Sequence, residues 1–204
     1  MNRQDAPSHF FAYLARMKYI QRWGLMRNTQ TENVQEHSLQ VAMIAHALAV
    51  IGNRLHGENN DTGHIACLAL YHDASEILTG DLPTPVKYHN ESMRGAYKAI
   101  ERQAEHTLLG LLPEVLREDF IPLLDSERMD ARAKRYIKAA DSIAGYLKCV
   151  EEERAGNQEF TRARRYLANK IEEFDDIPAV TDFMRLFVQS FELTLDDLSH
   201  APGG

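Results

Sequence analysis

The sequence predicts an all-α protein, a single compact multi-helix bundle over residues 1–204. No segment shows the sustained apolar and polar alternation that a half-buried strand requires. Apolar spacings of three and four recur instead in almost every segment between Gly, Pro and Asn residues. With 204 residues and 44% hydrophobic side chains the chain can bury a sizeable core. No repeat, composition break or flexible linker divides it, so one domain is expected.

The first two helices are predicted from caps and apolar stripes. Ser8 caps a helix over residues 8–23, which Gly24 ends and whose apolar stripe is Phe11, Tyr13, Leu14 and Met17. Asn33 and Glu36 have the spacing of a capping box, and they open a second helix that runs to about residue 51. Its apolar face carries His37, Val41, Ile44 and Leu48.

A third helix is expected from Thr62, carrying His72 and ending at Gly80. The following residues 81–85, DLPTP, contain two prolines and are predicted to be non-helical. A long fourth helix follows, with an apolar stripe of Met93, Tyr97, Ile100, Ala104, Leu108 and Leu111.

The remaining helices follow in the same way. Pro113 starts a fifth helix that Pro122 closes, and residues 125–132 form a charged connector. A sixth helix covers residues 133–156, and Asn157 caps a seventh. The last helix carries Val180, Phe183, Met184, Phe187, Val188 and Phe191, an apolar face that belongs either to the core or to a second subunit.

Charge and composition exclude several classes of function. Thirty acidic against 23 basic residues give a net charge of −7, which disfavours a nucleic-acid polymer or an anionic membrane as partner. The densest apolar run, residues 41–51, is too short to span a bilayer. Cys67 and Cys149 lack metal-site or disulfide spacing and are interpreted as core residues. A cytoplasmic setting is therefore expected.

Four residues form the pattern that carries chemistry. His37 shares the apolar face of the second helix, His72 and Asp73 come near the end of the third, and Asp141 interrupts the apolar face of the sixth. A carboxylate on a buried face is costly unless it is paired or bound to a metal. Two imidazoles and two carboxylates suit one divalent transition metal ion, with open positions for water and a substrate oxygen. Glu76 shares a helix face with His72 and is a candidate proton carrier.

Each of these residues also has a plainer interpretation. His37 could lie in a capping region, and the His72-Asp73 pair could end a helix, where His is favoured by the helix dipole. Asp141 could pair with Arg135 or Lys138 on its own helix. The convergence of four suitable ligands from three helices favours the metal site over these alternatives.

The order His37, His72-Asp73, Asp141 on separate helices resembles the H…HD…D signature of the HD-domain metal-dependent phosphohydrolases. Longer stretches resemble the bacterial 5'-deoxynucleotidases of the YfbR type over nearly the whole chain. These stretches are SHFFA (8–12), RW (22–23), MRN (26–28), TENVQEHSLQVA (31–42), YHDASE (71–76), LTGDLPTPVKY (78–88) and YLKC (146–149).

The resemblance implies hydrolysis of 2'-deoxyribonucleoside 5'-monophosphates to deoxynucleoside and phosphate, with rejection of ribonucleotides. It implies a homodimer, a metal ion such as Co or Mn, and the same four ligands, His37, His72, Asp73 and Asp141. Its catalytic residues correspond to Arg22, Glu76 and Asp81. Its substrate-binding residues correspond to Arg22, Trp23, His37, Asp73, Asp81, Leu82, Pro83, Thr84 and Asp141.

Residue by residue, other interpretations remain open at this stage. Arg22 suits bidentate phosphate binding but also a surface salt bridge, and Trp23 suits a sugar contact that excludes a 2'-hydroxyl but also a core position. Residues 82–85 hold Thr84 beside the metal or serve only as a rigid connector. Either Glu76 or Asp81 relays the proton to the leaving oxygen.

Two other functions are considered. The first is an HD-type hydrolase of a different nucleotide, such as a signalling nucleotide or a deoxynucleoside triphosphate. The second is a non-catalytic helical regulator that binds a small ligand or DNA, against which the net charge of −7 counts.

Overall fold

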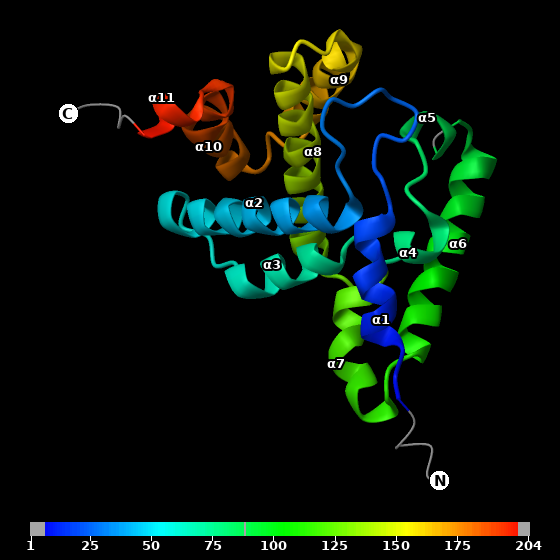
Figure 1. Ribbon diagram of the computed structural model, residues 1–204. Helices are drawn as coiled ribbons and strands as arrows, with labels where there is room; N and C mark the ends of the chain where they lie inside the picture. The colour runs from blue at the N-terminus through cyan, green and yellow to red at the C-terminus, as the bar shows by residue number, and fades with distance from the viewer. Residues whose placement is uncertain (1–6, 88, 200–204) are drawn as a thin grey trace.

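The computed structural model describes residues 7–87 and 89–199, and all the regular secondary structure in this part of the chain is helical (Figure 1). Its only extended pairing is an isolated antiparallel bridge between Gln21 and Asn33. The all-α prediction is therefore confirmed. Residues 1–6, Tyr88 and residues 200–204 of the predicted single domain lie outside the described residues.

Two long helices cross at the centre of the larger core. Figure 1 shows α2 (Val34–Leu55) crossing α8 (Ala131–Arg154), with α3 (Thr62–Tyr71) beside α2. The outer helices are α9 (Thr161–Glu172), which packs on α8, and α10 (Pro178–Phe187), which packs on α2. Fully buried aliphatic side chains line the crossing, each worth about 1.5–3 kcal/mol of burial: Val41, Leu48, Ile143 and Leu147.

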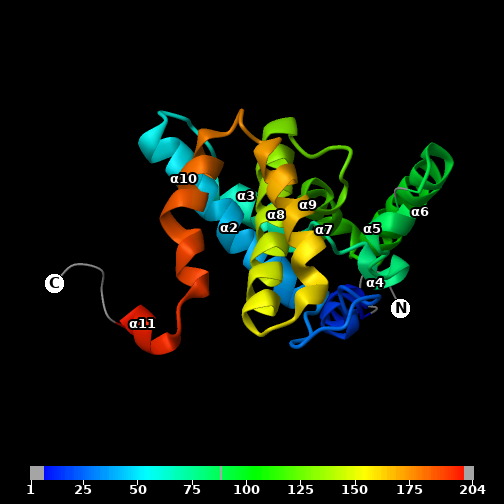
Figure 2. The same cartoon turned by 90° about the horizontal axis from the view of Figure 1, so that it is seen from above.

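A smaller apolar cluster holds a second group of helices, which Figure 2 shows on the opposite side of the bundle from α10. Its buried members are Phe10, Ala74, Leu108, Leu109, Leu112 and Leu124. The helices that surround it are α1 (Phe10–Leu14), α4 (Glu76–Thr79), α6 (Glu91–Gly110) and α7 (Glu114–Leu124). The short helix α5 (Thr84–Lys87) packs on α6. The remaining elements are α11 (Leu195–Ser199) and the 3-10 helices η2 (Ala15–Tyr19), η3 (Gln158–Phe160) and η4 (Val188–Glu192).

The predicted capping box is confirmed. The side chain of Asn33 accepts a hydrogen bond from the backbone N–H of Glu36 at 3.0 Å, and the Glu36 carboxylate accepts one from the backbone N–H of Asn33 at 3.2 Å. These bonds satisfy two backbone donors at the helix start. They fix the first turn of α2 and thereby the position of His37.

The prediction of one helix over residues 8–23 is wrong. α1 gives way to η2, which ends at Tyr19, because Ile20 pairs through its carbonyl with the backbone of Val34 at 3.0 Å. The predicted stripe also fails in part, since Phe11 and Tyr13 are exposed and Phe10 is buried instead. This long-range pairing turns the chain away from a helical path and leaves residues 20–33 as a loop.

The predicted third helix is interrupted near its C-terminal end. α3 stops at Tyr71, residues 72–75 form turns, and α4 begins at Glu76 and ends at Thr79, followed by the C-cap Gly80, whose φ of 72° suits glycine. His72 and Glu76 therefore lie on either side of a break rather than on one continuous helix face. The predicted start at Thr62 and end at Gly80 are both confirmed.

The other differences between the predicted and observed helices lie at two prolines and on the exposed side of α6. Pro122 lies inside α7, which ends two residues later at Leu124. Residues 81–83 are non-helical as predicted, but α5 is a helical turn in which Pro85 takes the second position, where its missing N–H is tolerated. Met93 and Ile100 of the fourth-helix stripe are exposed.

The final predicted helix is also shorter than expected. α10 ends at Phe187, which is exposed, and η4 carries the chain on. Phe183 is buried, and Met184, Val188 and Phe191 pack partly buried against the larger core. The aromatic and Met face therefore belongs mainly to the core.

By length and composition alone, α2 is apolar enough to cross a membrane, but half of its apolar window is buried inside the protein. It packs against α3, α8 and α10. This packing is typical of the central helix of a folded core, and the helix carries His37 at its buried start.

Candidate active site

Three of the predicted ligands meet at the crossing of the two central helices. His37 from α2, His72 from the turn after α3 and Asp141 from α8 each offer a ligand atom, and these atoms all lie within 4.8 Å of one another. Nε2 of His37 is 3.1 Å from Oδ1 of Asp141. The His37 side chain is fully buried, whereas the Asp141 side chain keeps 38% of its surface exposed and forms the open side of the cluster.

Asp73 joins the same cluster. Its Oδ2 atom lies 3.2 Å from Nε2 of His72 and 3.8 Å from Nε2 of His37. The structure therefore brings all four predicted ligands together, two nitrogens and two carboxylates from separate elements. Of the two alternative partners for Asp141, Arg135 pairs instead with Asp176 and with the carbonyl of Glu173, and Lys138 makes no ion pair with Asp141 among the described residues.

The hydrogen bonds of His72 fit a metal ligand. Its Nδ1 is 2.7 Å from the carbonyl oxygen of Ala69, which can only accept, so Nδ1 carries the proton. Nε2 is buried and has no hydrogen-bond partner among the described residues. A fixed Nδ1–H and a bare Nε2 beside carboxylates are the arrangement of a metal-binding imidazole. The donor set thus fits a divalent cation.

The charges of these groups bear on how a cation would bind. Burial lowers the pKa of His72, but the Asp73 charge outweighs it and raises the pKa to about 9, so a metal ion that binds Nε2 would displace a proton. Burial also tends to raise the pKa of Asp73 and of Asp141. The histidines and Arg22 reverse that effect and hold both pKa values well below the usual range. Two partly exposed carboxylates that stay ionised beside each other form a strong site for positive charge.

Arg22 lies beside this cluster rather than in a surface salt bridge. Its Nη1 donates to Oδ2 of Asp73 at 3.4 Å, and its Nε donates to Oε2 of Glu32 at 3.1 Å. The Arg22 side chain is 13% exposed. Nη2 makes no hydrogen bond to a described residue, so one edge of the guanidinium is available to a bound anion.

Trp23 adopts an unusual backbone conformation next to Arg22. Its φ is 59°, which places a bulky residue in the left-handed region, where a strain of about 1–3 kcal/mol is normal. The indole Nε1 donates to Oε2 of Glu32 at 3.0 Å, and the ring packs against Phe160 with centroids 5.3 Å apart. A Cβ on Gly145 of α8 would lie 3.9 Å from the ring, so the indole rests above that helix. Such strain is typical of functional positions.

Glu76 and Asp81 stand close to the same carboxylates. Burial, followed by the charges of Asp73 and Asp81, raises the pKa of Glu76 to about 10. Glu76 is buried, and its Oε2 has no hydrogen-bond partner among the described residues. The pKa of Asp81 is also raised by burial, although Arg22 and a hydrogen bond from the backbone of Trp23 work against this. The pKa values of Glu76 and Asp81 are thus raised, whereas those of Asp73 and Asp141 are lowered. Carboxyl groups with raised pKa values are suited to proton transfer.

The other predicted loop residues lie farther along the chain. Leu82 and Pro83 are half-buried between Asp81 and α5, and Thr84 is exposed at the start of that helical turn. No hydrogen bond connects them to the metal-ligand cluster within the described part of the chain. Their role in binding substrate stays a prediction.

Sequence reasoning missed Glu32, although it belongs to the TENVQEHSLQVA stretch. The Glu32 residue is 9% exposed, and its Oε2 accepts from both Arg22 and Trp23. Its Oε1 is 3.9 Å from Nδ1 of His37. The only sequence signal near Glu32 is the neighbouring capping box of Asn33 and Glu36, which does not involve Glu32. Apolar periodicity assigns it no role either.

A second missed residue, Glu152 of α8, fastens the loop that carries Arg22 and Trp23. Its carboxylate accepts from the backbone N–H and hydroxyl of Thr29 at 2.8 and 2.6 Å, and from the backbone N–H of Gln30 at 3.1 Å. Lys148 bonds both Glu152 and the carbonyl of Gln30. These contacts tie the loop to α8.

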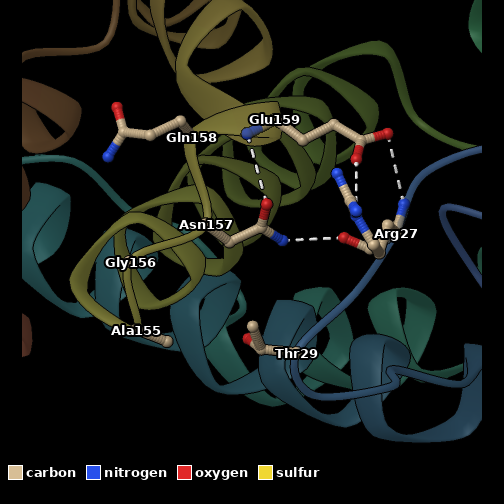
Figure 3. A pocket seen from close by; sticks show the side chains of 7 residues that line it. All are labelled: Arg27, Thr29, Ala155, Gly156, Asn157, Gln158 and Glu159. Atoms are coloured by element: carbon tan, nitrogen blue, oxygen red, sulfur yellow. Dashed lines mark hydrogen bonds and ion pairs between the residues drawn. The ribbon is translucent and has the colours of Figure 1, made fainter.

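A pocket of about 400 Å³ lies where the loop of residues 20–33 meets the segment that follows α8 (Figure 3). Asn157 donates to the carbonyl of Arg27 at 2.7 Å, and the Glu159 carboxylate accepts from the backbone N–H of Arg27 at 3.3 Å. Figure 3 shows these side chains reaching across the pocket to the loop. No predicted site residue lines it, and its contacts serve to hold the loop.

Comparisons with known proteins identify the family of the chain and agree with its helical fold. A family model described as "5'-deoxynucleotidase YfbR-like" matches residues 9–191. A 5'-deoxynucleotidase of Shewanella oneidensis is 54% identical over 192 residues, covering 94% of this chain and 98% of that protein. The 5'-deoxynucleotidase YfbR of Escherichia coli K12 is 53% identical over 197 residues, covering 94% and 96%.

Solved structures show the same fold at lower identity. An HD-domain phosphohydrolase of Listeria innocua superposes with a TM-score of 0.79 at 21% identity, covering 94% of this chain and 92% of that one. A cyanophage S-2L HD phosphohydrolase, solved with dA and one catalytic Zn²⁺ ion, gives a TM-score of 0.62 at 20% identity, covering 90% and 96%.

The helical fold is that of the HD-domain phosphohydrolase structures, and His37, His72, Asp73 and Asp141 meet within it. The chain belongs to the YfbR-like 5'-deoxynucleotidase family.

Proposed function

We propose that this protein is a metal-dependent 5'-deoxynucleotidase, which hydrolyses 2'-deoxyribonucleoside 5'-monophosphates to deoxynucleoside and phosphate. The observation that carries the proposal is the meeting of His37, His72, Asp73 and Asp141 with Arg22 directly beside Asp73. Membership of the YfbR-like family supports the substrate class.

The four ligands would hold one divalent ion, and Co or Mn is proposed because a mixed imidazole and carboxylate set suits such metals. When bound, the cation supplies Lewis-acid chemistry that activates water and neutralises phosphate charge. Arg22 offers its free Nη2 edge to the phosphate, while Asp73 keeps the guanidinium at the cluster.

Glu76 is proposed to deliver the proton to the leaving 5' oxygen. It is buried, and burial with two neighbouring carboxylates raises its pKa to about 10, so it carries a proton at neutral pH. A protonated carboxyl is a competent general acid for an alkoxide leaving group. Asp81, which is less buried and faces Arg22, is assigned to holding the substrate.

Trp23 is proposed to select the deoxyribose. The indole is held at its nitrogen by Glu32 and on its face by Phe160. A ring fixed in this way cannot move aside for an added 2'-hydroxyl, so a ribonucleotide would be excluded by overpacking. Leu82, Pro83 and Thr84 are proposed to line the same substrate space beyond Asp81.

A homodimer is proposed, with the face formed by α1, α2 and α3 as its interface. Four large apolar side chains are exposed there: Phe11, Leu39, Met43 and Leu70. Three of them line a groove of about 630 Å³. Exposed apolar surface of this kind is typical of subunit contacts. A small-molecule partner and a cytoplasmic location are proposed with it.

The test is phosphate release from matched deoxyribonucleoside and ribonucleoside 5'-monophosphates by the purified protein. Deoxy substrates should be hydrolysed and ribo substrates rejected. Chelation should abolish release, and added Co²⁺ or Mn²⁺ should restore it. Unchanged release by a protein shown by elemental analysis to be metal-free would overturn the metal requirement, and equal rates on both sugars would overturn the substrate assignment.

A further inference from the structure

One carboxylate connects the two residues that are proposed to contact the substrate. Oε2 of Glu32 accepts from Nε of Arg22 at 3.1 Å and from Nε1 of Trp23 at 3.0 Å. Both donors meet a single acceptor atom, so the guanidinium and the indole are held in one mutual arrangement. Glu32 itself is nearly buried, which strengthens such bonds.

The backbone holds Glu32 at a fixed distance from its two partners. The N–H of Arg22 donates to the carbonyl of Glu32 at 2.9 Å, and the N–H of Val34 donates to the carbonyl of Ile20 at 3.0 Å. Glu32 and Arg22 therefore face each other across the base of the loop. These two backbone hydrogen bonds lie directly before α2, the helix that carries the ligand His37, so the Glu32 side chain projects from a fixed segment of backbone.

Trp23 needs such a support, because its φ of 59° is disfavoured for a bulky side chain. Phe160 supports the ring face, but Glu32 makes the only hydrogen bond to the indole nitrogen in the described part of the chain. Loss of the carboxylate would leave the partly buried Arg22 guanidinium without one partner, and the indole of Trp23 without its polar contact.

We propose that Glu32 is a positioning residue that sets deoxyribose selectivity and phosphate binding together, by holding Trp23 and Arg22 in one arrangement beside the metal-ligand cluster. The inference rests on the proposed function for its substrate. It assigns Glu32 no contact with the substrate and no part in proton transfer. Apart from the 3.9 Å approach of its Oε1 to Nδ1 of His37, which the excess metal in the test addresses, its action passes through the two side chains that it holds.

The test compares Glu32→Gln and Glu32→Ala with the wild type, in the full-length protein with excess Co²⁺. Both variants should raise the KM for dAMP, by about tenfold or more for Ala, since bonds to charged groups are among the stronger ones. The ratio of kcat/KM for dAMP to that for AMP should fall, more for Ala than for Gln. Glu36→Gln is the matched control, because Gln serves equally well in a capping box, and it should change neither value.

Trp23 is the only tryptophan in the chain, so its fluorescence reports on the indole directly and without substrate. Quenching by acrylamide should increase in both Glu32 variants and stay unchanged in Glu36→Gln. A wild-type sugar ratio with wild-type quenching in Glu32→Gln would overturn the proposal, and this variant decides the matter if Glu32→Ala does not fold. If the wild type hydrolyses no deoxynucleotide, the proposed function fails, while the quenching comparison still decides whether Glu32 holds the indole.

Discussion

His37 and Asp141 stand 104 residues apart in the chain, yet Nε2 of one and Oδ1 of the other are 3.1 Å apart. The crossing of α2 and α8 makes this contact, so the metal-ligand cluster is a product of the core itself. Residues that build the crossing, such as Leu48 and Ile143, are fully buried beside it. The site should therefore be rigid and preformed.

Replacing Asp141 by Asn should remove a charged ligand while preserving side-chain size. We expect phosphate release to fall to about one hundredth of the wild-type rate or less, with bound metal reduced in parallel. Circular dichroism should show an unchanged helical content. Near wild-type activity and metal content would show that Asp141 serves only the helix crossing.

Glu76→Gln should test the general acid. Glutamine keeps the shape and a neutral charge but cannot give up a proton, so kcat should fall by about 100-fold. KM should change little, because Glu76 is not expected to hold the phosphate. Steady-state kinetics on dAMP, with metal content measured in the same samples, would separate this effect from metal loss. A raised KM with unchanged kcat would contradict the assignment.

Trp23→Ala should admit ribonucleotides. Removing the indole opens the space that a 2'-hydroxyl would occupy, so the preference for dAMP over AMP should fall by about tenfold or more. The measurement is the ratio of the two kcat/KM values. A variant that loses activity equally on both sugars would show that the ring only supports the loop.

The buried Lys148 and Glu152 pair should make stability depend on pH. Burial acts to raise the pKa of Glu152, but hydrogen bonds from Lys148, Thr29 and Asn157 outweigh it and hold the pKa well below the usual range. A carboxyl whose pKa is lowered by folding stabilises the protein above its unfolded-state pKa, about 4.3. That contribution is lost as the pH falls toward the lower, folded-state value.

Glu152→Gln should therefore unfold more easily than the wild type at pH 7, by about 3 kcal/mol, since it leaves Lys148 buried without its counter-charge. The difference should shrink as the pH falls below about 4. Urea unfolding at several pH values measures it. Glu118, which is exposed on α7, provides the control, and Glu118→Gln should show little change at any pH. A difference that does not vary with pH would contradict the charge-based explanation.

Leu39→Glu should disrupt the proposed dimer. A charge in the centre of the exposed face of α1, α2 and α3 cannot be buried without a partner, so the variant should be monomeric in light scattering at micromolar concentration. Val115, which is 80% exposed on α7, provides the control substitution Val115→Glu. A wild-type protein that is itself monomeric would refute the interface.

The sequence was sufficient to predict the helices whose ends have their own chemical signals. Asn33 and Glu36 define the start of α2 through a local capping box, and Asp141 is conspicuous because it interrupts an apolar helix face. The four metal ligands could be predicted because imidazole and carboxylate side chains stand out at these positions of the predicted helices. The structure then placed them together.

The features that sequence reasoning missed depend on contacts between distant segments. The break at His72 follows from neither Gly nor Pro, and the early end of the first helix depends on Val34 pairing with Ile20. Glu32 and Glu152 are ordinary acidic residues until the fold surrounds them with donors. Side chains whose role is to hold other side chains leave no periodic pattern.

α8 carries both Asp141 and Glu152, and their separation of eleven residues along the chain corresponds to about three helical turns, or roughly 16 Å along one face. The helix thus fixes the distance between the metal-ligand cluster and the loop that carries Arg22. Deleting a single residue between the two would rotate Glu152 by about 100° relative to Asp141. Point substitutions on the outer face of this stretch should therefore be tolerated. Any change in its length would instead displace the loop that carries Arg22 and Trp23 relative to the metal-ligand cluster.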